Sequence, residues 1–291
     1  MLIQKNDIPA WNATWLATMG MALVLILMST LPAKAAISNG EDRPCGSLKL
    51  AFYEHGALYY QQRDGSYAGI DKDIVDELEK RTSCQFDTVL ESRARIWSQM
   101  EKGLIDITMS GIPNSEREKY AVFFPYLSSH NYVLIQKNLA LPAATPESFL
   151  AETQFKIAVV KAFQHGSKID DWLDKMRLQK RVTEVADVAT LFRIFKAGRV
   201  DAIVALPTTW GQHQAQKEFL YNARVQDWFP VETGTGGMVI SRFRVNSQLA
   251  MRIEKALQEM HEDGSMEVIF KRHVNADIAR HLLIDKYRRR Q

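Results

Sequence analysis

Residues that could hold a small solute come directly after apolar, strand-like segments of the chain. Tyr53, Glu54 and His55 follow the first such segment, Arg93 follows the second, and Ser110 follows the third. Open α/β sheets bind ligands beyond the carboxyl ends of their strands. A guanidinium at such a place can hold an anion through paired hydrogen bonds, and an aromatic ring can cover an apolar part of a ligand. The pattern predicts a site for a small polar or anionic molecule.

The elements that position these residues alternate between strands and helices along almost the whole chain. Apolar, β-branched segments predict strands over residues 48–53, 86–90, 105–109, 156–160 and 201–205. Between them, apolar residues recur at helical spacing. Strands that alternate with helices predict parallel pairing, with the helices packed on the faces of the sheet.

Polar residues mark the predicted starts of several helices. Ser92, Asp187 and either Asn246 or Ser247 are expected N-caps, because a short side-chain oxygen can accept hydrogen bonds from the free N–H groups of the first turn. The helix after Ser92 is expected to bury Leu104 with its other apolar residues, and a later helix is expected to bury Val268.

Two short segments of the chain are similar to each other. Residues 101–107 and 196–202 each combine a helix end, a glycine, a β-branched residue, an aspartate and the start of a strand. A glycine at this place is suited to end a helix in the left-handed conformation. The two segments fall where a duplicated α/β lobe would place them.

The two cysteines of the chain, Cys45 and Cys84, come just before the first and second predicted strands. Parallel strands start at the same edge of a sheet, so the two sulfurs can meet if these strands are neighbours. An exported chain reaches an oxidising compartment, where a disulfide persists. The alternative is a pair of unrelated buried thiols.

The first 35 residues differ from the rest and predict an export signal. A polar start with Lys5 leads into an apolar run over residues 16–28, followed by Pro32 and by Ala33-Lys34-Ala35. Small residues at these spacings are typical of a signal-peptidase site, which predicts cleavage near Ala35 and a periplasmic protein. The alternative is an uncleaved membrane anchor over residues 15–31.

The composition is that of a soluble globular protein, with 46% hydrophobic and 24% charged residues. The formal net charge of +3 does not indicate a bulk nucleic-acid or membrane-surface binder. The chain contains no Gly-x-Ser-x-Gly, no His-Glu-x-x-His and no Cys/His spacing typical of a metal site. We therefore expect no metal, no cofactor and no nucleic-acid partner.

Several segments, taken in order, resemble the family-3 extracellular solute-binding proteins, the polar amino-acid type of ABC importers. These segments are residues 69–74 (Gly-Ile-Asp-Lys-Asp-Ile), 103–106, 110–120, 124–126 and 198–202. The resemblance covers about residues 46–273. It implies an α/β fold of the periplasmic binding protein-like II type, in which two Rossmann-like lobes are joined by two hinge strands and close around a ligand.

The resemblance also implies the boundaries of the lobes and the roles of further residues. Lobe one would hold residues 44–130 and 236–291, and lobe two residues 133–232. Arg117 in the Ser-Glu-Arg segment would bind a ligand carboxylate through two parallel hydrogen bonds, which lysine cannot reproduce. Tyr59 would form an aromatic wall. Ser167, at a helix start, would help to bind an anion through free N–H groups.

Some of these assignments stay open on the sequence alone. Arg117 could instead be a surface arginine paired with Glu116 or Glu118, and Tyr59 could pack in the core. The segment 111–117 is one residue shorter than the family pattern, which puts a ligand contact from Ser110 in doubt.

A departure at one position bears on the ligand itself. Leu206 stands where amino-acid binders of the family place an aspartate for the ligand ammonium. Either Glu54 replaces that aspartate from the opposite lobe, or the ligand lacks an ammonium group. An organic anion is then expected as much as an amino acid.

The expected function is that of a periplasmic solute-binding protein of an ABC importer, not an enzyme. It would be a monomer that captures a small amino acid or organic anion and delivers it to an ABC permease in the inner membrane. One alternative is a dehydratase-like periplasmic enzyme, for which Glu54, His55, Glu91 and His165 could act as general acid or base. The other is a ligand-sensing module.

Overall fold

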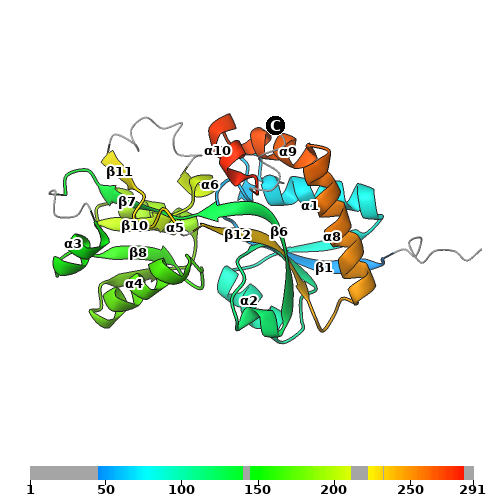
Figure 1. Cartoon of the computed structure of the whole chain (residues 1–291), viewed down its shortest axis with the longest axis horizontal. Coiled ribbons are helices and arrows are strands. Elements are labelled where there is room, and N and C mark those ends of the chain that lie inside the picture. The colour runs from blue at the N-terminus through cyan, green and yellow to red at the C-terminus, as the bar shows by residue number, and fades with distance from the viewer. Residues whose placement is uncertain (1–44, 140–144, 211–221, 232, 285–291) are drawn as a thin grey trace, which may run out of the picture. The chain divides into compact units, whose positions relative to one another are not determined.

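The computed structural model describes residues 45–139, 145–210, 222–231 and 233–284. They form two five-stranded sheets, each flanked by helices (Figure 1). The expected export signal at residues 1–35 lies outside the described residues. No helix within the described residues is long and apolar enough to cross a membrane.

The first sheet has the strand order β4-β1-β5-β12-β6. Its strands are β1 (Ser47–Phe52), β4 (Gln85–Leu90), β5 (Ile107–Gly111), β6 (Ala121–His130) and β12 (Thr233–Ser241). β1 pairs in parallel with β4 and β5, as the alternating pattern predicted, and β12 pairs antiparallel with β5 and β6.

The predicted disulfide lies at the edge where β1 and β4 begin. Ser47 of β1 pairs with Gln85 of β4. Cys45 and Cys84, just before these residues, are bonded to each other with their Cα atoms 5.0 Å apart. The neighbouring parallel strands therefore bring the two thiols together, and the alternative of two unrelated thiols is wrong.

The second sheet has the order β11-β7-β10-β8-β9. Its strands are β7 (Tyr132–Gln136), β8 (Ile157–Val160), β9 (Val182–Val185), β10 (Ala202–Ala205) and β11 (Ala223–Gln226). β8 pairs in parallel with β9 and β10, whereas β7 runs antiparallel to β10 and β11. Every residue of β8 and β10 is buried, which explains their continuous apolar sequences.

Two long strands connect the sheets. β6 and β12 pair along most of their length, from His130 opposite Thr233 to Ala121 opposite Ser241 (Figure 1). After β6 the chain enters the second sheet through Asn131 and β7, and after β11 it returns into β12. This arrangement confirms the predicted fold of two α/β lobes joined by two hinge strands.

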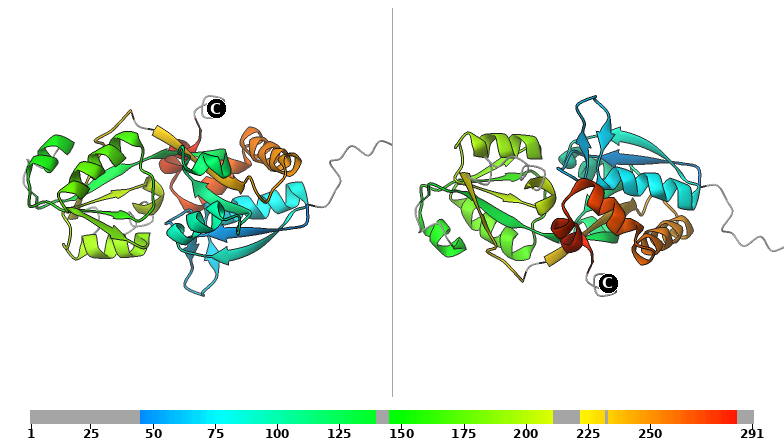
Figure 2. Two further views of the ribbon diagram at one scale, coloured as in Figure 1. Left: turned by 90° about the horizontal axis from the view of Figure 1, so that it is seen from below. Right: turned by 90° about the horizontal axis from the view of Figure 1, so that it is seen from above.

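Helices cover both faces of each sheet (Figures 1 and 2). In the first lobe, α1, α8, α9 and α10 pack on one face and α2 on the other; in the second, α3 and α4 pack opposite α5. The helices are α1 (Ile70–Thr82), α2 (Arg93–Glu101), α3 (Pro146–Ala151), α4 (Ser167–Leu178), α5 (Val188–Lys196), α6 (Pro207–Trp210), α8 (Ser247–Glu262), α9 (Ser265–His273) and α10 (Ala276–Leu282).

The predicted N-caps are confirmed, and of the two candidates for α8 the cap is Asn246, since Ser247 is the first residue of the helix. The side chains of Ser92, Asp187 and Asn246 each accept a hydrogen bond from a backbone N–H in the first turn of α2, α5 and α8. The burial predicted for Leu104 and Val268 is wrong, since both are 53% exposed. α2 ends before Leu104, and Val268 lies on the opposite side of α9 from its buried residues.

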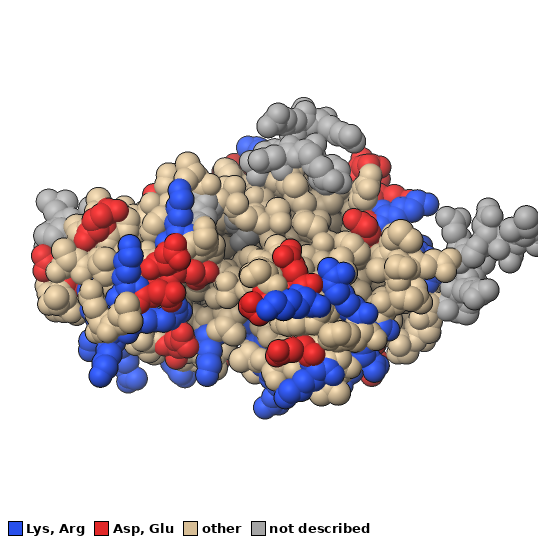
Figure 3. Space-filling model, turned by 60° about the horizontal axis from the view of Figure 1, so that its bottom comes forward, with Lys and Arg blue, Asp and Glu red and all other residues tan. Residues whose placement is uncertain are grey.

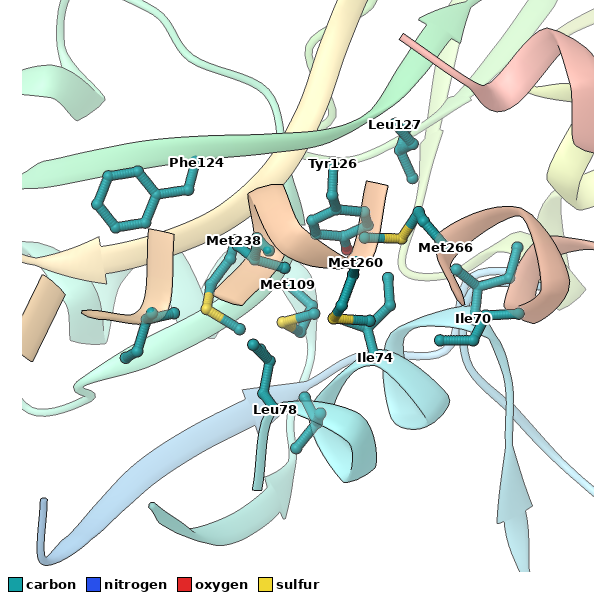
Figure 4. Close-up of a cluster of buried hydrophobic side chains, with 14 of the residues drawn as sticks. Ile70, Ile74, Leu78, Met109, Phe124, Tyr126, Leu127, Met238, Met260 and Met266 are labelled. Atoms are coloured by element: carbon teal, nitrogen blue, oxygen red, sulfur yellow. The ribbon is translucent and has the colours of Figure 1, made fainter. Parts of the chain in front are cut away.

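The core of the first lobe lies between the sheet and the helices α1, α8 and α9 (Figure 4). Ile70, Ile74 and Leu78 project from one face of α1 toward methionines of β5, β12, α8 and α9. Full burial of each such side chain stabilises the fold by roughly 1.5–3 kcal/mol. This core fixes the strand ends from which the polar residues of the cleft project.

The two similar segments have the same local structure in both lobes. Gly103 and Gly198 both have φ of +64°. Asp106 accepts a hydrogen bond from the backbone N–H of Lys49 at 2.7 Å, and Asp201 accepts one from the N–H of Lys156, also at 2.7 Å. The repeated aspartates therefore join each segment to the neighbouring strand.

The charged side chains on the face shown in Figure 3 are of mixed sign. Lysines and arginines lie among aspartates and glutamates, and no patch of one sign covers this face. The even distribution agrees with the small formal net charge of +3.

Candidate functional site

The residues predicted from the strand ends meet at the carboxyl edge of the first sheet. Tyr53 follows β1, Arg93 opens α2 after β4, and Ser110 lies in β5. The hydroxyl of Tyr53 donates to the carbonyl oxygen of Ser110 at 3.2 Å. The guanidinium carbon of Arg93 lies 4.6 Å from the centroid of the Tyr53 ring. Three of the predicted residues are thus brought together.

Arg93 is enclosed by aromatic rings from both lobes. It is 2% exposed, and its guanidinium carbon lies 4.6 Å from the ring centroid of Phe163, just after β8 of the second lobe. Among the described residues, none of its three side-chain nitrogens has a hydrogen-bond partner of good geometry, although Arg93 lies close enough to the Tyr53 hydroxyl to oppose the rise that burial causes in the pKa of Tyr53. The rings offer cation–π attraction, but a buried cation without acceptors remains costly. The surroundings of Arg93 therefore suit an added anion.

Arg117 is also buried, at 6% exposure, and contacts both lobes. Its guanidinium stacks 3.7 Å from the ring centroid of Trp97. It donates to the carbonyl of Ile112 at 3.0 Å and, across the cleft, to the carbonyl of Ala162 at 2.9 Å. Burial, followed by the charge of Arg93, lowers the pKa of Arg117 to about 9, so it stays charged at neutral pH.

The alternative of a surface arginine paired with a neighbouring glutamate does not describe Arg117. Glu116 instead pairs with Lys119 on the surface. The buried guanidinium of Arg117 has the two carbonyl partners just named, and the cleft, not the solvent, surrounds it.

Ser110 is held by a buried carboxyl group that the sequence did not single out as part of the site. Its hydroxyl lies 2.9 and 2.8 Å from the two carboxyl oxygens of Asp71, and Tyr126 donates to Asp71 at 2.6 Å. Burial raises the pKa of Asp71 to about 7, against the effect of these hydrogen bonds. With its side chain engaged in this way, Ser110 positions Tyr53 through its carbonyl group.

Two non-glycine residues with left-handed backbone lie at this cleft. Ser110 has φ of 51° and Ala162 has φ of 61°. Each follows or ends a strand, and each presents its carbonyl to a site residue, Tyr53 and Arg117 respectively. Left-handed backbone is uncommon outside glycine and is often found at functional sites.

Two histidines lie at the cleft, His55 from the first lobe and His165 from the second. His55 stacks on Phe163 with ring centroids 5.3 Å apart, and neither ring nitrogen has a partner among the described residues. Burial, followed by the charge of Arg93, lowers the pKa of His55 to about 3, so the ring is neutral at pH 7. His165, by contrast, has its Nδ1 2.9 Å from Asp170, and its carbonyl accepts from Asn131.

Three of the predicted residues do not join this group. Glu54 is exposed. Tyr59 stacks between Phe52 and Tyr67, with ring centroids 4.2 and 5.0 Å away, and belongs to the core of the first lobe. Ser167 begins α4 as predicted, but its side chain is exposed. Leu206, the departure from the family pattern, is buried in the core of the second lobe.

The lobes touch closely at Gly56. The N–H of the next residue, Ala57, donates to the carbonyl of Thr208 at 2.8 Å. Gly56 has φ of +56°, and a Cβ there would lie 2.5 Å from that carbonyl oxygen. A small hollow beside this contact, lined by His55, Phe163 and other residues mostly of the second lobe, has a volume of about 10 Å³. Arg93 and Arg117 are buried where the lobes meet, so a solute reaches them only when the lobes move apart.

A larger hollow of about 210 Å³ lies beside the hinge strands. It is lined by residues of β6, β7, α6 and α10, among them His130 and Tyr132, and by none of the predicted site residues. Within the described residues, no group of His, Cys, Asp or Glu is placed to hold a metal ion.

Comparison with known proteins decides the family. The model of the bacterial extracellular solute-binding proteins, family 3, matches residues 51–276. The chain belongs to this family. No curated protein matches the chain in sequence.

Solved structures with the fold of this family-3 protein have different functions. The substrate-binding protein of an amino-acid ABC transporter has 16% identity and a TM-score of 0.63, covering 78% of this chain and 99% of that one. An ancestral amino-acid-binding protein, described as a precursor of cyclohexadienyl dehydratase, has 19% identity and a TM-score of 0.64, covering 79% and 96%. A histidine kinase sensor domain has 15% identity and a TM-score of 0.66, covering 81% and 97%. At these identities the likeness shows the fold alone.

Phe163 and Asp71 lie at the cleft without having been predicted there, although a signal for Phe163 was present. Phe163 lies three residues after β8 of the second lobe, so the rule applied to the first lobe selects this segment as well. Asp71 belongs to the segment 69–74 that carries the resemblance, but no local pattern in that segment distinguishes its buried position from an exposed one.

Proposed function

We propose that this chain is the binding component of an ABC importer and captures a small amino acid or organic anion by closing its lobes. The observation that carries the proposal is the buried guanidinium of Arg93, which lies between rings of both lobes without an acceptor among the described residues. The acidic group of a solute would supply those acceptors. Capture of a solute is also what membership in the family supports.

Each residue of the cleft has a role in this proposal. Arg117 binds a carboxylate of the solute, in exchange for one or both of its carbonyl partners. Arg93 provides the second cation, and Tyr53, held by Ser110, packs against it. Phe163 covers the site from the second lobe. The charged groups thus come from the first lobe and the cover from the second.

Closure follows from the burial of the two arginines where the lobes meet. The proposed lobes are residues 44–130 with 236–291, and residues 133–232. Because Arg93 and Arg117 are buried and contact the second lobe, the solute binds to an open form, and hinge strands β6 and β12 bend as the lobes come together.

The properties of the candidate acid–base groups weigh against the enzyme alternative. A general base acts best with a pKa near the working pH, whereas the pKa of His55 is lowered to about 3. Glu91 pairs with Arg95, and Glu54 is exposed. His165 is bonded to Asp170. Asp71 has a pKa raised to about 7, but its carboxyl group is engaged by Ser110 and Tyr126. These features favour binding over catalysis.

A thermal-shift screen of the purified protein tests the proposal. The panel holds amino acids, dicarboxylates, aromatic acids and sugars. A solute at about 100 times its Kd stabilises the folded state by about 2.7 kcal/mol, which raises Tm by roughly 5–10 °C in a chain of this size. We expect an acid to give this shift and to be recovered unchanged. A solute that is consumed would favour the enzyme, and a panel without any shift would contradict capture.

Export and delivery complete the proposal. We expect cleavage near Ala35, a periplasmic monomer, and handover to an ABC permease in the inner membrane. Mass spectrometry of the exported protein checks the cleavage, and uptake of the labelled solute by cells with and without the gene checks the delivery. Uptake that does not depend on the gene would favour the sensor alternative.

A further inference from the structure

The cleft contains more positive than negative charge. Arg93 and Arg117 are both buried, and they are close enough for the charge of Arg93 to lower the pKa of Arg117. Two buried guanidinium groups in a water-poor site require compensating negative charge. The question is then which carboxyl groups of the chain could supply it.

Two aspartates of the cleft act on these arginines but are held by other hydrogen bonds. The charge of Asp170 opposes the lowering of the pKa of Arg117, and the charge of Arg93 opposes the rise in the pKa of Asp71. Asp71 is bonded to Ser110 and Tyr126, and burial raises its pKa to about 7, so much of it is neutral at physiological pH. Asp170 is bonded to both the ring and the backbone N–H of His165. Glu54 is exposed. The aspartates offset part of the positive charge, but within the described residues neither accepts a hydrogen bond from Arg93 or Arg117. The solute must therefore bring the anionic acceptors for these two guanidinium groups.

The unpaired side-chain nitrogens of Arg93 and Trp97 are hydrogen-bond donors, which likewise favour a solute with acceptors. The Nε and both Nη atoms of Arg93, together with the indole N–H of Trp97, are buried donors without partners within the described part of the chain. The Trp97 ring lies 5.9 Å from the Arg93 guanidinium and 3.7 Å from that of Arg117. A solute rich in acceptor oxygens satisfies these donors, because each unpaired buried donor is costly.

From this balance we infer that the solute is a dianion without an ammonium group, of the small dicarboxylate class. The inference rests on the proposed function and narrows its solute. Two carboxylates match the two guanidinium groups, whereas a monocarboxylate leaves one of them unmatched. An ammonium group would sit beside two cations with no free carboxylate to receive it, so amino acids bind more weakly than the corresponding diacids.

Matched sets of probes test the inference by titration calorimetry on the purified protein. Succinate, aspartate and butyrate form one set, because aspartate adds an ammonium group to succinate and butyrate lacks its second carboxylate. Malonate and glutarate, each with its amino acid and monoacid, extend the sets to other chain lengths. We expect one diacid to bind about 30-fold or more tightly than its two matched analogues, as expected for an unmatched buried charge.

The possible results separate the inference from the proposed function. An amino acid that binds more tightly than its diacid would overturn the inference and leave solute capture standing. The same holds if a sugar or a monoacid binds and the diacids do not. No binding in these sets or in the wider panel would overturn both.

Arg93→Met, with Arg95→Met as its matched control, tests the charge argument directly. Arg95 lies two positions away on α2, exposed and paired with Glu91. Removal of a buried unmatched cation should raise Tm of the solute-free protein by about 2 °C or more, while affinity for the diacid falls about 100-fold. The preference for diacid over monoacid should disappear. A variant with lower Tm and an unchanged preference would assign Arg93 a structural role and overturn the inference.

Discussion

In both lobes a glycine turn and an aspartate join a helix to the next strand, and the aspartate accepts a hydrogen bond of 2.7 Å from the neighbouring strand. The strand ends that face the cleft are different. Those of the first lobe carry Arg93 and Arg117, whereas the second lobe presents the ring of Phe163 and the carbonyl of Ala162. The helix–glycine–aspartate–strand unit is therefore structural and common to both lobes. The residues that follow its strands differ: those of the first lobe are suited to bind the solute, and those of the second lobe to cover it.

The first prediction concerns the disulfide, which the first lobe contains and the second lacks. The bridge between Cys45 and Cys84 spans 39 positions of sequence. Closing a loop of this length restricts the unfolded chain and stabilises the fold by roughly 4 kcal/mol. The double change Cys45→Ser with Cys84→Ser should lower the free energy of unfolding by about that amount, as measured by urea denaturation.

Hydrogen exchange shows whether this loss belongs to the first lobe. Amides of β1 and β4 should lose protection, while those of β8 and β10 keep theirs. Reduced wild-type protein is the matched control and should behave like the double variant. Equal loss of protection in both lobes would mean that they unfold as one unit.

The second prediction tests whether a cation of the first lobe binds the solute. Arg117→Ala should weaken binding of an acidic solute by about 100-fold or more, because a buried charge pair is lost. Arg117→Lys should restore little, since an ammonium cannot form two parallel hydrogen bonds. The control is Lys119→Ala, which removes an exposed cation nearby. Full affinity in Arg117→Ala would remove this residue from the proposed site.

The third prediction concerns Asp106 and Asp201, the corresponding aspartates of the two similar segments. Asp106 is buried and also pairs with Arg244; the bond of Asp201 to Lys156 is exposed. We expect Asp106→Ala to destabilise the protein by about 2 kcal/mol and Asp201→Ala by about 1 kcal/mol. Denaturation curves check both values. If neither change destabilises the protein, the repeated hydrogen bond has no structural importance.

The smallest effect is expected at Phe163, in the second lobe. Phe163→Leu keeps an apolar cover but removes the aromatic ring from Arg93. A cation–π contact in a desolvated site contributes about 1–2 kcal/mol, so affinity should fall roughly 5- to 30-fold. The salt dependence of the affinity for the acidic solute should stay the same in Phe163→Leu, whereas Arg117→Ala should reduce it. A change in salt dependence in Phe163→Leu would show that the two lobes do not divide the work in this way.

Local patterns in the sequence were sufficient to predict the strands, the helix starts and the disulfide. Apolar alternation, short polar caps such as Asp187, and the position of each cysteine before a strand all depend on neighbours along the chain or along one sheet. The strand-end rule also brought Tyr53, Arg93 and Ser110 together correctly.

Contacts between distant segments could not be predicted in the same way. Arg93 and Phe163 are 70 positions apart and belong to different lobes, and their contact depends on how the lobes meet. The stacking of Tyr59 between two rings, and the exposure of Glu54, follow from local turns after β1 that no periodic pattern describes. Leu104 shows the same limit, because its helix ends earlier than its apolar spacing suggests.

The most direct test of the account is a crystal structure of the protein with the diacid that binds most tightly. We expect one carboxylate within hydrogen-bonding distance of Arg117, the other at Arg93, and the ring of Phe163 closed over the solute. A solute held in the hollow beside His130 and Tyr132, with Arg93 still lacking an acceptor, would contradict it.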